Sequence, residues 1–106
     1  MPRYIVKLND PQDNKDYYLE WSTVVDAPIT YGLSLAEFHG YYQEEYGRMG
    51  MQDLSQRMER VEQKGCSSLL HDNADDLISG NHAGEKGEEL SKDQIIEKFC
   101  RLRPAE

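Results

Sequence analysis

The chain is 106 residues long, which fits a single domain with one modest hydrophobic core. Twenty acidic residues against twelve basic ones give a formal net charge of −8, so the summed field repels a phosphate backbone and attracts basic surfaces. We therefore expect no direct binding to nucleic acid. Two cysteines are too few for a disulfide scaffold or a zinc ligand set, and no segment reaches the about 18 apolar residues of a membrane span or resembles a signal peptide. We expect a cytoplasmic protein, and nothing in the sequence calls for a cofactor.

Two runs near the N-terminus alternate as β-strands do. Residues 3–8 (RYIVKL) and 16–23 (DYYLEWST) are rich in β-branched and aromatic side chains, and the connecting NDPQDNK holds strong turn formers. They predict a β-hairpin with a loop of about seven residues. Pro28 would restrict a third strand in TVVDAPITYG to an edge. Because a lone hairpin is marginal in water and an open edge invites pairing, we expect the chain to form a homo-oligomer.

Residues 34–37 (SLAE) form a capping box, which predicts a helix from Ser34 to about residue 46, ended by Gly47. Its apolar stripe would pack on the hairpin face that carries Tyr17, Leu19 and Trp21. The stripe consists of Leu35, Phe38 and Tyr42.

Two or three further short helices are predicted downstream, which makes three or four in all. Residues 51–64 place apolar side chains at helical spacing, and Gly65 is a natural stop. Asn73 would cap a brief helix over residues 74–79, and Ser91 with Gln94 forms a second capping box that opens a C-terminal helix. The resulting fold class is α+β in a single domain, 1–106, with a hairpin or three-stranded sheet over 1–33, two helices over 34–65, an acidic loop-rich segment over 66–90 and the C-terminal helix over 91–102.

Residues 71–89 (HDNADDLISGNHAGEKGEE) concentrate six carboxylates against one lysine, Lys86. Core packing does not explain so polar a segment, which favours a solvated surface, a metal site or a binding face. Carboxylates on a small rigid surface can imitate the phosphates of a nucleic acid and occupy a basic groove of a protein partner. With two tyrosines outside the predicted core stripes, the predicted partner-binding residues are Asp72, Asp75, Asp76, Glu85, Glu88, Glu89, Tyr18 and Tyr31.

A metal-dependent hydrolase is one alternative for the same segment. Histidine and aspartate side chains bind zinc, manganese or magnesium, and a helical spacing of four residues would bring two of them to one face. No HExxH, CxxC or EF-hand pattern accompanies them. The candidate ligands are His71, Asp72, Asp75, Asp76 and His82.

The second alternative is a protein that sequesters a small nucleotide at a subunit interface. Tyrosine rings can stack on a nucleobase, and arginine side chains can bind phosphate. The residues proposed for this pocket are Tyr31, Arg48, Arg57 and Arg60.

Four runs of this chain resemble small uncharacterised accessory proteins of tailed phages: EWSTVVDAPITYGLSLAEF, YYQEEYG, DDLISGNHAG and LSKDQIIEKFC. The resemblance covers most of the chain and carries no functional residues with it. It implies an accessory role in the host cytoplasm, such as inhibition of a host factor or a defence system, and such proteins act by binding. We therefore expect a small acidic binding protein that blocks or sequesters a host component.

Overall fold

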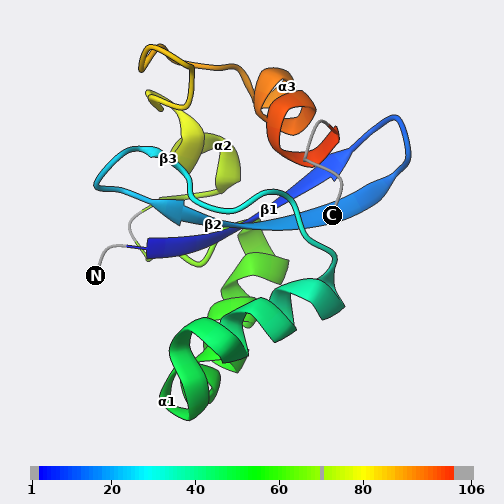
Figure 1. Ribbon diagram of the computed structural model, residues 1–106, viewed down its shortest axis with the longest axis vertical. Coiled ribbons are helices and arrows are strands. Elements are labelled where there is room, and N and C mark those ends of the chain that lie inside the picture. The colour runs from blue at the N-terminus through cyan, green and yellow to red at the C-terminus, as the bar shows by residue number, and fades with distance from the viewer. Residues whose placement is uncertain (1–2, 70, 102–106) are drawn as a thin grey trace.

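The computed structural model describes residues 3–69 and 71–101. A three-stranded antiparallel sheet in the order β1-β2-β3 forms the middle layer, from β1 (Arg3–Asp10), β2 (Lys15–Ser22) and β3 (Ala27–Pro28). The long helix α1 (Leu35–Lys64) covers one face, and the short helices α2 (Ala74–Ile78) and α3 (Lys92–Ile95) lie on the other (Figure 1). A π-helix, η1 (Ile96–Arg101), continues directly from α3. The expected α+β class is confirmed, and Pro28 lies in the edge strand as predicted.

The hairpin loop is shorter than predicted. The strands pair as far as Asp10 and Lys15, which leaves residues 11–14 as the connection. Polar side chains close this turn, because the carboxylate of Asp10 accepts the amide of Gln12 at 2.9 Å and that of Asp13 accepts the amide of Lys15 at 2.9 Å. Asn14 adopts φ 55°, a left-handed conformation that asparagine tolerates better than most residues.

Helix α1 has two arms that meet at Gly47. Gly47 has φ 65° and ψ −157°, a conformation that is open essentially to glycine alone. Both ends follow their sequence signals, since Ser34 and Glu37 form the predicted capping box and Gly65 ends the helix with φ 84°. The predicted caps at Asn73 and Ser91 also form. Position 102, at the end of the predicted C-terminal helix, lies outside the described residues.

The sheet is buried on both faces, and this overturns the predicted docking of the first helix. Phe38 and Tyr42 pack on the face that carries Ile5 and Tyr18, in a cluster we name the α1 core (Ile5, Tyr18, Phe38, Tyr42, Leu54 and Val61). The face predicted for them packs instead against the C-terminal layer, in the C-terminal core (Val6, Leu8, Leu19, Trp21, Cys66, Ala74, Leu77, Ile78, Ile95, Ile96 and Cys100). Successive side chains along each strand therefore enter two different cores, and neither face of the sheet is left to solvent.

Both edges of the β1–β2 pair carry backbone hydrogen bonds. On the β1 side, the amide of Lys7 donates to the carbonyl of Gly65 at 2.8 Å, and that of Ser67 donates to Ile5 at 2.9 Å. On the β2 side, Tyr18 and Leu33 exchange two bonds of 2.8 and 3.0 Å beyond the short strand β3. The open edge that motivated the expected homo-oligomer is thus covered at these positions, and self-association stays a prediction.

A bidentate ion pair ties the C-terminal layer to the hairpin turn. Arg101 donates from Nε to Oδ2 of Asp10 at 2.8 Å and from its terminal nitrogen to Oδ1 at 2.6 Å. Hydrogen bonding to Arg101 lowers the pKa of Asp10 from 3.8 to about 2, with a further contribution from the Gln12 amide. Because this pKa is depressed on folding, the pair stabilises the protein above pH 4 and stops doing so as the pH falls through 2.

We expect Asp10→Asn to be less stable than the wild type at pH 5, with a gap that closes toward pH 2 because the wild-type carboxylate then becomes protonated. Urea unfolding midpoints measured across this range check the prediction. Asp53→Asn, at an exposed position on α1, is the matched control. The difference between its unfolding midpoint and that of the wild type should stay the same across this pH range. A gap for Asp10→Asn that stays constant down to pH 2 would contradict the assignment.

Candidate functional site

The acidic segment contains an ordered loop that is built around Asn81. Asn81 is buried, and its side-chain amide donates to the carbonyls of Ile78 and Leu90 at 2.8 Å each. Its Oδ1 accepts the amides of Ala83 at 3.1 Å and Leu90 at 3.0 Å. One side chain thereby satisfies backbone groups at both ends of the loop, so residues 82–89 close on themselves. Sequence reasoning missed Asn81, although an asparagine after Gly80 in a polar run is a known turn signal.

A second set of contacts shapes the tip of the loop. The amide of Gly84 donates to the carbonyl of Glu88 at 2.9 Å, and that of Gly87 donates to Gly84 at 3.0 Å. Gly87 has φ 79°, and any side chain at Gly84 would collide with the carboxylate of Glu88. At the base, the amide of His82 donates to the carbonyl of Asp26 in the β2–β3 turn at 2.8 Å. The loop therefore presents its carboxylates from a fixed backbone.

An open pocket of about 330 Å³ lies between this loop and the helices α3 and η1. Three carboxylates line it, from Glu85 and Glu88 on the loop and Glu97 on η1, and Leu90 contributes apolar surface. The one basic side chain in the lining is Lys98, whose ammonium donates to the carbonyl of Ala83 at 3.0 Å. We name this site the acidic pocket. A volume near the lower end for ligand sites and an excess of negative charge suit a guanidinium or ammonium group.

Backbone amides favour the charged form of one pocket carboxylate. Hydrogen bonds from the amides of Glu88 itself and of Lys86 lower the pKa of Glu88, and the nearby charge of Lys98 adds to the effect. The Lys86 bond measures 2.9 Å. Glu88 is therefore ionised at neutral pH, and its charge is held at a defined position in the acidic pocket.

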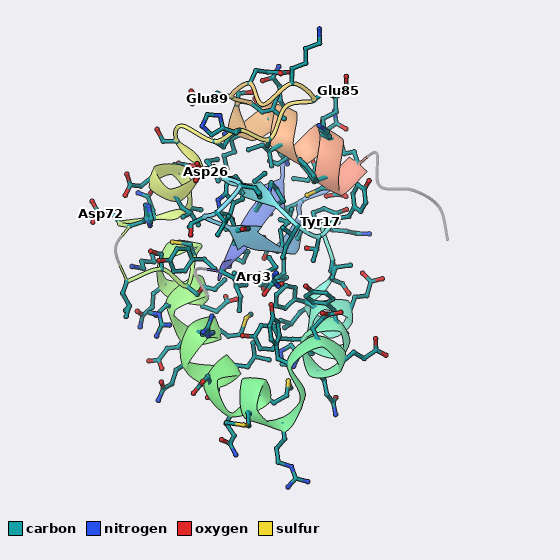
Figure 2. All side chains as sticks on the ribbon, turned by 60° about the vertical axis from the view of Figure 1, so that its left-hand side comes forward. Arg3, Tyr17, Asp26, Asp72, Glu85 and Glu89 are labelled. Atoms are coloured by element: carbon teal, nitrogen blue, oxygen red, sulfur yellow. The ribbon has the colours of Figure 1, made fainter. Side chains whose placement is uncertain are left out.

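The six predicted carboxylates divide into two groups. Glu85 and Glu89 lie on the loop at the top of Figure 2, whereas Asp72 lies lower, beside α2. The α2 group, Asp72, Asp75 and Asp76, stands at the start of that helix, where Asp76 accepts the amide of Asp72 at 3.1 Å. Asp75 forms an ion pair with Lys92 of α3 at 3.1 Å. All six side chains are exposed, but only Glu85 and Glu88 line the acidic pocket.

Searches against protein-family models, curated proteins and solved structures found no match to this chain. No helix within the described residues is long and apolar enough to cross a membrane.

The two predicted contact tyrosines differ in exposure. Tyr18 is 5% exposed and belongs to the α1 core, so the expectation that it lies outside the core is wrong. It looked peripheral because only one face of the hairpin was expected to be buried. Tyr31 is 44% exposed and packs against Phe99 of η1 at 6.0 Å between ring centroids, which leaves part of it accessible on the C-terminal layer.

The proposed nucleotide residues do not converge. Tyr31 packs on the C-terminal layer, whereas the three arginines belong to α1 on the other face of the sheet. Arg57 donates to the carbonyl of Arg3 at 3.3 Å, and Arg60 donates to that of Ser67 at 2.7 Å. These two side chains bind the protein's own backbone in this structure.

The candidate metal ligands are not gathered into one site either. Among residues 3–69 and 71–101, no three histidine, cysteine, aspartate or glutamate side chains are grouped so as to hold a metal ion. Nδ1 of His71 lies 2.7 Å from the hydroxyl of Ser68, and that of His82 lies 2.8 Å from the carbonyl of Gly87. The two histidines instead contact the segments on either side of α2.

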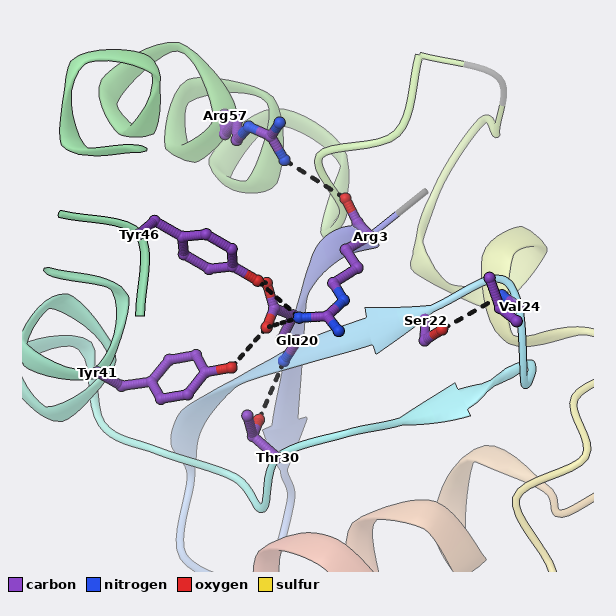
Figure 3. A network of polar contacts seen from close by, with 8 residues as sticks. All are labelled: Arg3, Glu20, Ser22, Val24, Thr30, Tyr41, Tyr46 and Arg57. Atoms are coloured by element: carbon purple, nitrogen blue, oxygen red, sulfur yellow. Dashed lines mark hydrogen bonds and ion pairs between the residues drawn. The ribbon is translucent and has the colours of Figure 1, made fainter. Parts of the chain in front are cut away.

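A buried carboxylate on β2 is a second feature that sequence reasoning missed. Glu20 is 2% exposed and accepts the hydroxyl of Tyr41 at 2.5 Å and that of Tyr46, and Arg3 lies 3.7 Å from its Oε1 (Figure 3). Burial is the main cause that raises the pKa of both tyrosines, so both hydroxyls remain protonated donors at neutral pH. The cluster attaches the first arm of α1 to the sheet, and the one available signal was an acid inside a strand run of apolar neighbours.

Proposed function

We propose that this protein is a small acidic binding protein that occupies a basic surface of a partner protein and blocks it. The acidic pocket receives an arginine or lysine side chain of that partner, and the surrounding carboxylates pair with further basic groups. Following the resemblance of the sequence to phage accessory proteins, we further propose that the partner is a host factor, such as a component of a defence system.

The observation that carries this proposal is the acidic pocket itself. Three carboxylates from two separate chain segments line one cavity, and the single lysine among them already donates to a loop carbonyl. A charged side chain that enters the pocket would gain charge-assisted hydrogen bonds that an ordinary acidic surface does not offer. This geometry favours recognition of one basic side chain.

The wider charge distribution points the same way. Residues 66–101 carry eight acidic and four basic residues. Their net charge of −4 is half of the net charge of the whole chain, −8. Such a field accelerates the encounter with a basic partner and disfavours acidic ones. Because Asn81 fixes the loop beforehand, little conformational entropy is lost when the carboxylates bind.

The test begins with tagged protein recovered from host cells, together with the proteins that copurify. We expect Glu85→Gln/Glu88→Gln/Glu97→Gln to weaken the affinity for the captured partner at least about tenfold at low salt, which corresponds to about 1.4 kcal/mol. We also expect wild-type affinity to fall with added salt, and the variant to show a shallower salt dependence. Titration calorimetry or surface plasmon resonance gives both quantities.

The matched control is Glu44→Gln/Glu45→Gln/Glu59→Gln, which removes the same charge from exposed positions on α1. It should lose much less affinity than the pocket variant, because it changes the net charge by the same amount but removes no direct contact with the bound basic side chain. A complex that is insensitive to salt, or equal losses in the two triple variants, would refute binding through the acidic pocket.

A further inference from the structure

A groove of about 550 Å³ lies between the two arms of α1. Its walls carry Leu35 and His39 from the first arm and Met51 and Met58 from the second, and Tyr18 contributes from the sheet. Leu35 is 46% exposed, and both methionines are only partly buried. We name this site the α1 groove. It exists because α1 breaks at Gly47 and its arms reach the same sheet face separately.

One wall of the α1 groove extends along the second arm of the helix. Its lining on the second arm runs from Met51 to Glu62 at helical spacing, with Leu54, Ser55 and Met58 between them. At 1.5 Å per residue this is about 16 Å, or three turns of helix. A groove of this length, walled by helices and lined by methionines, matches the way amphipathic helices insert their apolar faces into grooves.

The carboxylate of Glu62 at one end of the groove favours an occupant that carries a positive charge there. Glu62 lines it with a side chain that is 56% exposed, and its carboxylate accepts the hydroxyl of Tyr18 at 3.1 Å and the ammonium of Lys7 at 3.2 Å. A carboxylate has about four acceptor positions, so it has capacity for a further cation. His39 is the one basic residue in the lining, and the protein as a whole has a net charge of −8.

We propose that the α1 groove binds an amphipathic helical segment of a partner protein, one that presents apolar anchors over about three turns and a lysine or arginine to Glu62. The methionines adapt to the apolar anchors, and Leu54 and Tyr18 form the floor. This surface lies on the opposite face of the sheet from the acidic pocket. It would allow the protein to hold two parts of one partner, or two partners together.

The experiment uses the full chain with 13C-labelled methionine methyl groups and a synthetic helical peptide of about 15 residues, with leucines at helical spacing and a lysine-rich polar face. We expect the Met51 and Met58 signals to shift on titration, while Met49, which is 79% exposed and outside the groove, stays in place. The same peptide with glutamate in place of lysine should bind at least about threefold more weakly at low salt. Glu62→Gln should reduce that preference more than Glu59→Gln, which removes the same charge outside the groove.

Met58→Gln should weaken the peptide affinity at least about fivefold, and Met49→Gln makes the same chemical change outside the groove and should leave the affinity unchanged. Leu35→Gln, at a more exposed wall position, serves as a second variant should Met58→Gln lower the melting temperature. The proposal is overturned by equal shifts at all three methionines, or by unchanged affinity in both groove variants. Shifts on dilution of the protein alone would assign the groove to a second copy, and shifts with octylamine but not with the peptide would assign it to a small ligand.

Discussion

Glu20→Ala is expected to lower the free energy of unfolding by about 3–6 kcal/mol, at about 1.5–3 kcal/mol for each of the two tyrosine hydrogen bonds to the carboxylate. The substitution removes the shared acceptor of the Tyr41 and Tyr46 hydroxyls in a buried position. It also deprives Arg3 of the carboxylate 3.7 Å away. A domain of this size has a total stability of about 5–15 kcal/mol, so the loss is a large fraction of it. Urea unfolding at pH 7 measures the effect.

Two further variants separate the cluster from a general effect of removing an acid. Tyr41→Phe removes one of the two hydrogen-bond donors to Glu20 and leaves Tyr46, so it should lower the free energy of unfolding by about 1.5–3 kcal/mol. Glu59→Ala removes an exposed acid from α1 and should change stability by no more than about 0.5 kcal/mol. If Glu20→Ala and Glu59→Ala proved equally mild, the buried carboxylate would not hold α1 to the sheet.

Asn81→Ala is expected to release the acidic loop while the sheet and α1 remain folded. It removes four hydrogen bonds between the Asn81 side chain and backbone groups of Ile78, Ala83 and Leu90, at a cost on the order of 3 kcal/mol. Opening of the loop relieves this cost, because the released groups then bind water. We therefore expect much faster amide hydrogen exchange at Gly84 and Leu90, and little change in the strands.

The functional consequence of Asn81→Ala rests on the proposed function. Loop release separates Glu85 and Glu88 from Glu97, so partner affinity should fall about as far as in the triple pocket variant although no charge is lost. Asn73→Ala removes the cap of α2 and is the control. It should lower the free energy of unfolding by about 1 kcal/mol and leave amide hydrogen exchange in the loop unchanged. Slow exchange at Gly84 in Asn81→Ala would show that other contacts order the loop.

Local signals predicted most of the element boundaries. The capping boxes at Ser34 and Ser91 and the stop at Gly65 each depend on residues within four positions of one another. The acidic segment was also recognisable, because six carboxylates in nineteen residues stand out in composition. The acidic pocket could not be recognised from the sequence. Glu97 reaches it from η1, and no sequence pattern links Glu97 to Glu85 and Glu88.

Contacts between distant segments decided the rest. Alternation in β2 separated its two faces but did not reveal that both are buried, so the docking face of α1 and the position of Tyr18 were wrongly predicted. The Asp10–Arg101 pair joins residues 91 positions apart, and no sequence period signals it.

The sequence by itself determined the helix caps and the order of the helices and strands, and the sign of the charge that the molecule presents. These properties depend on backbone conformation and side-chain chemistry over a few neighbouring residues. Only the tertiary structure decided which carboxylates share a pocket, which carboxylate is buried and where the arms of α1 leave a groove. Those outcomes depend on how three layers pack, and packing energy is shared among residues that are far apart along the chain.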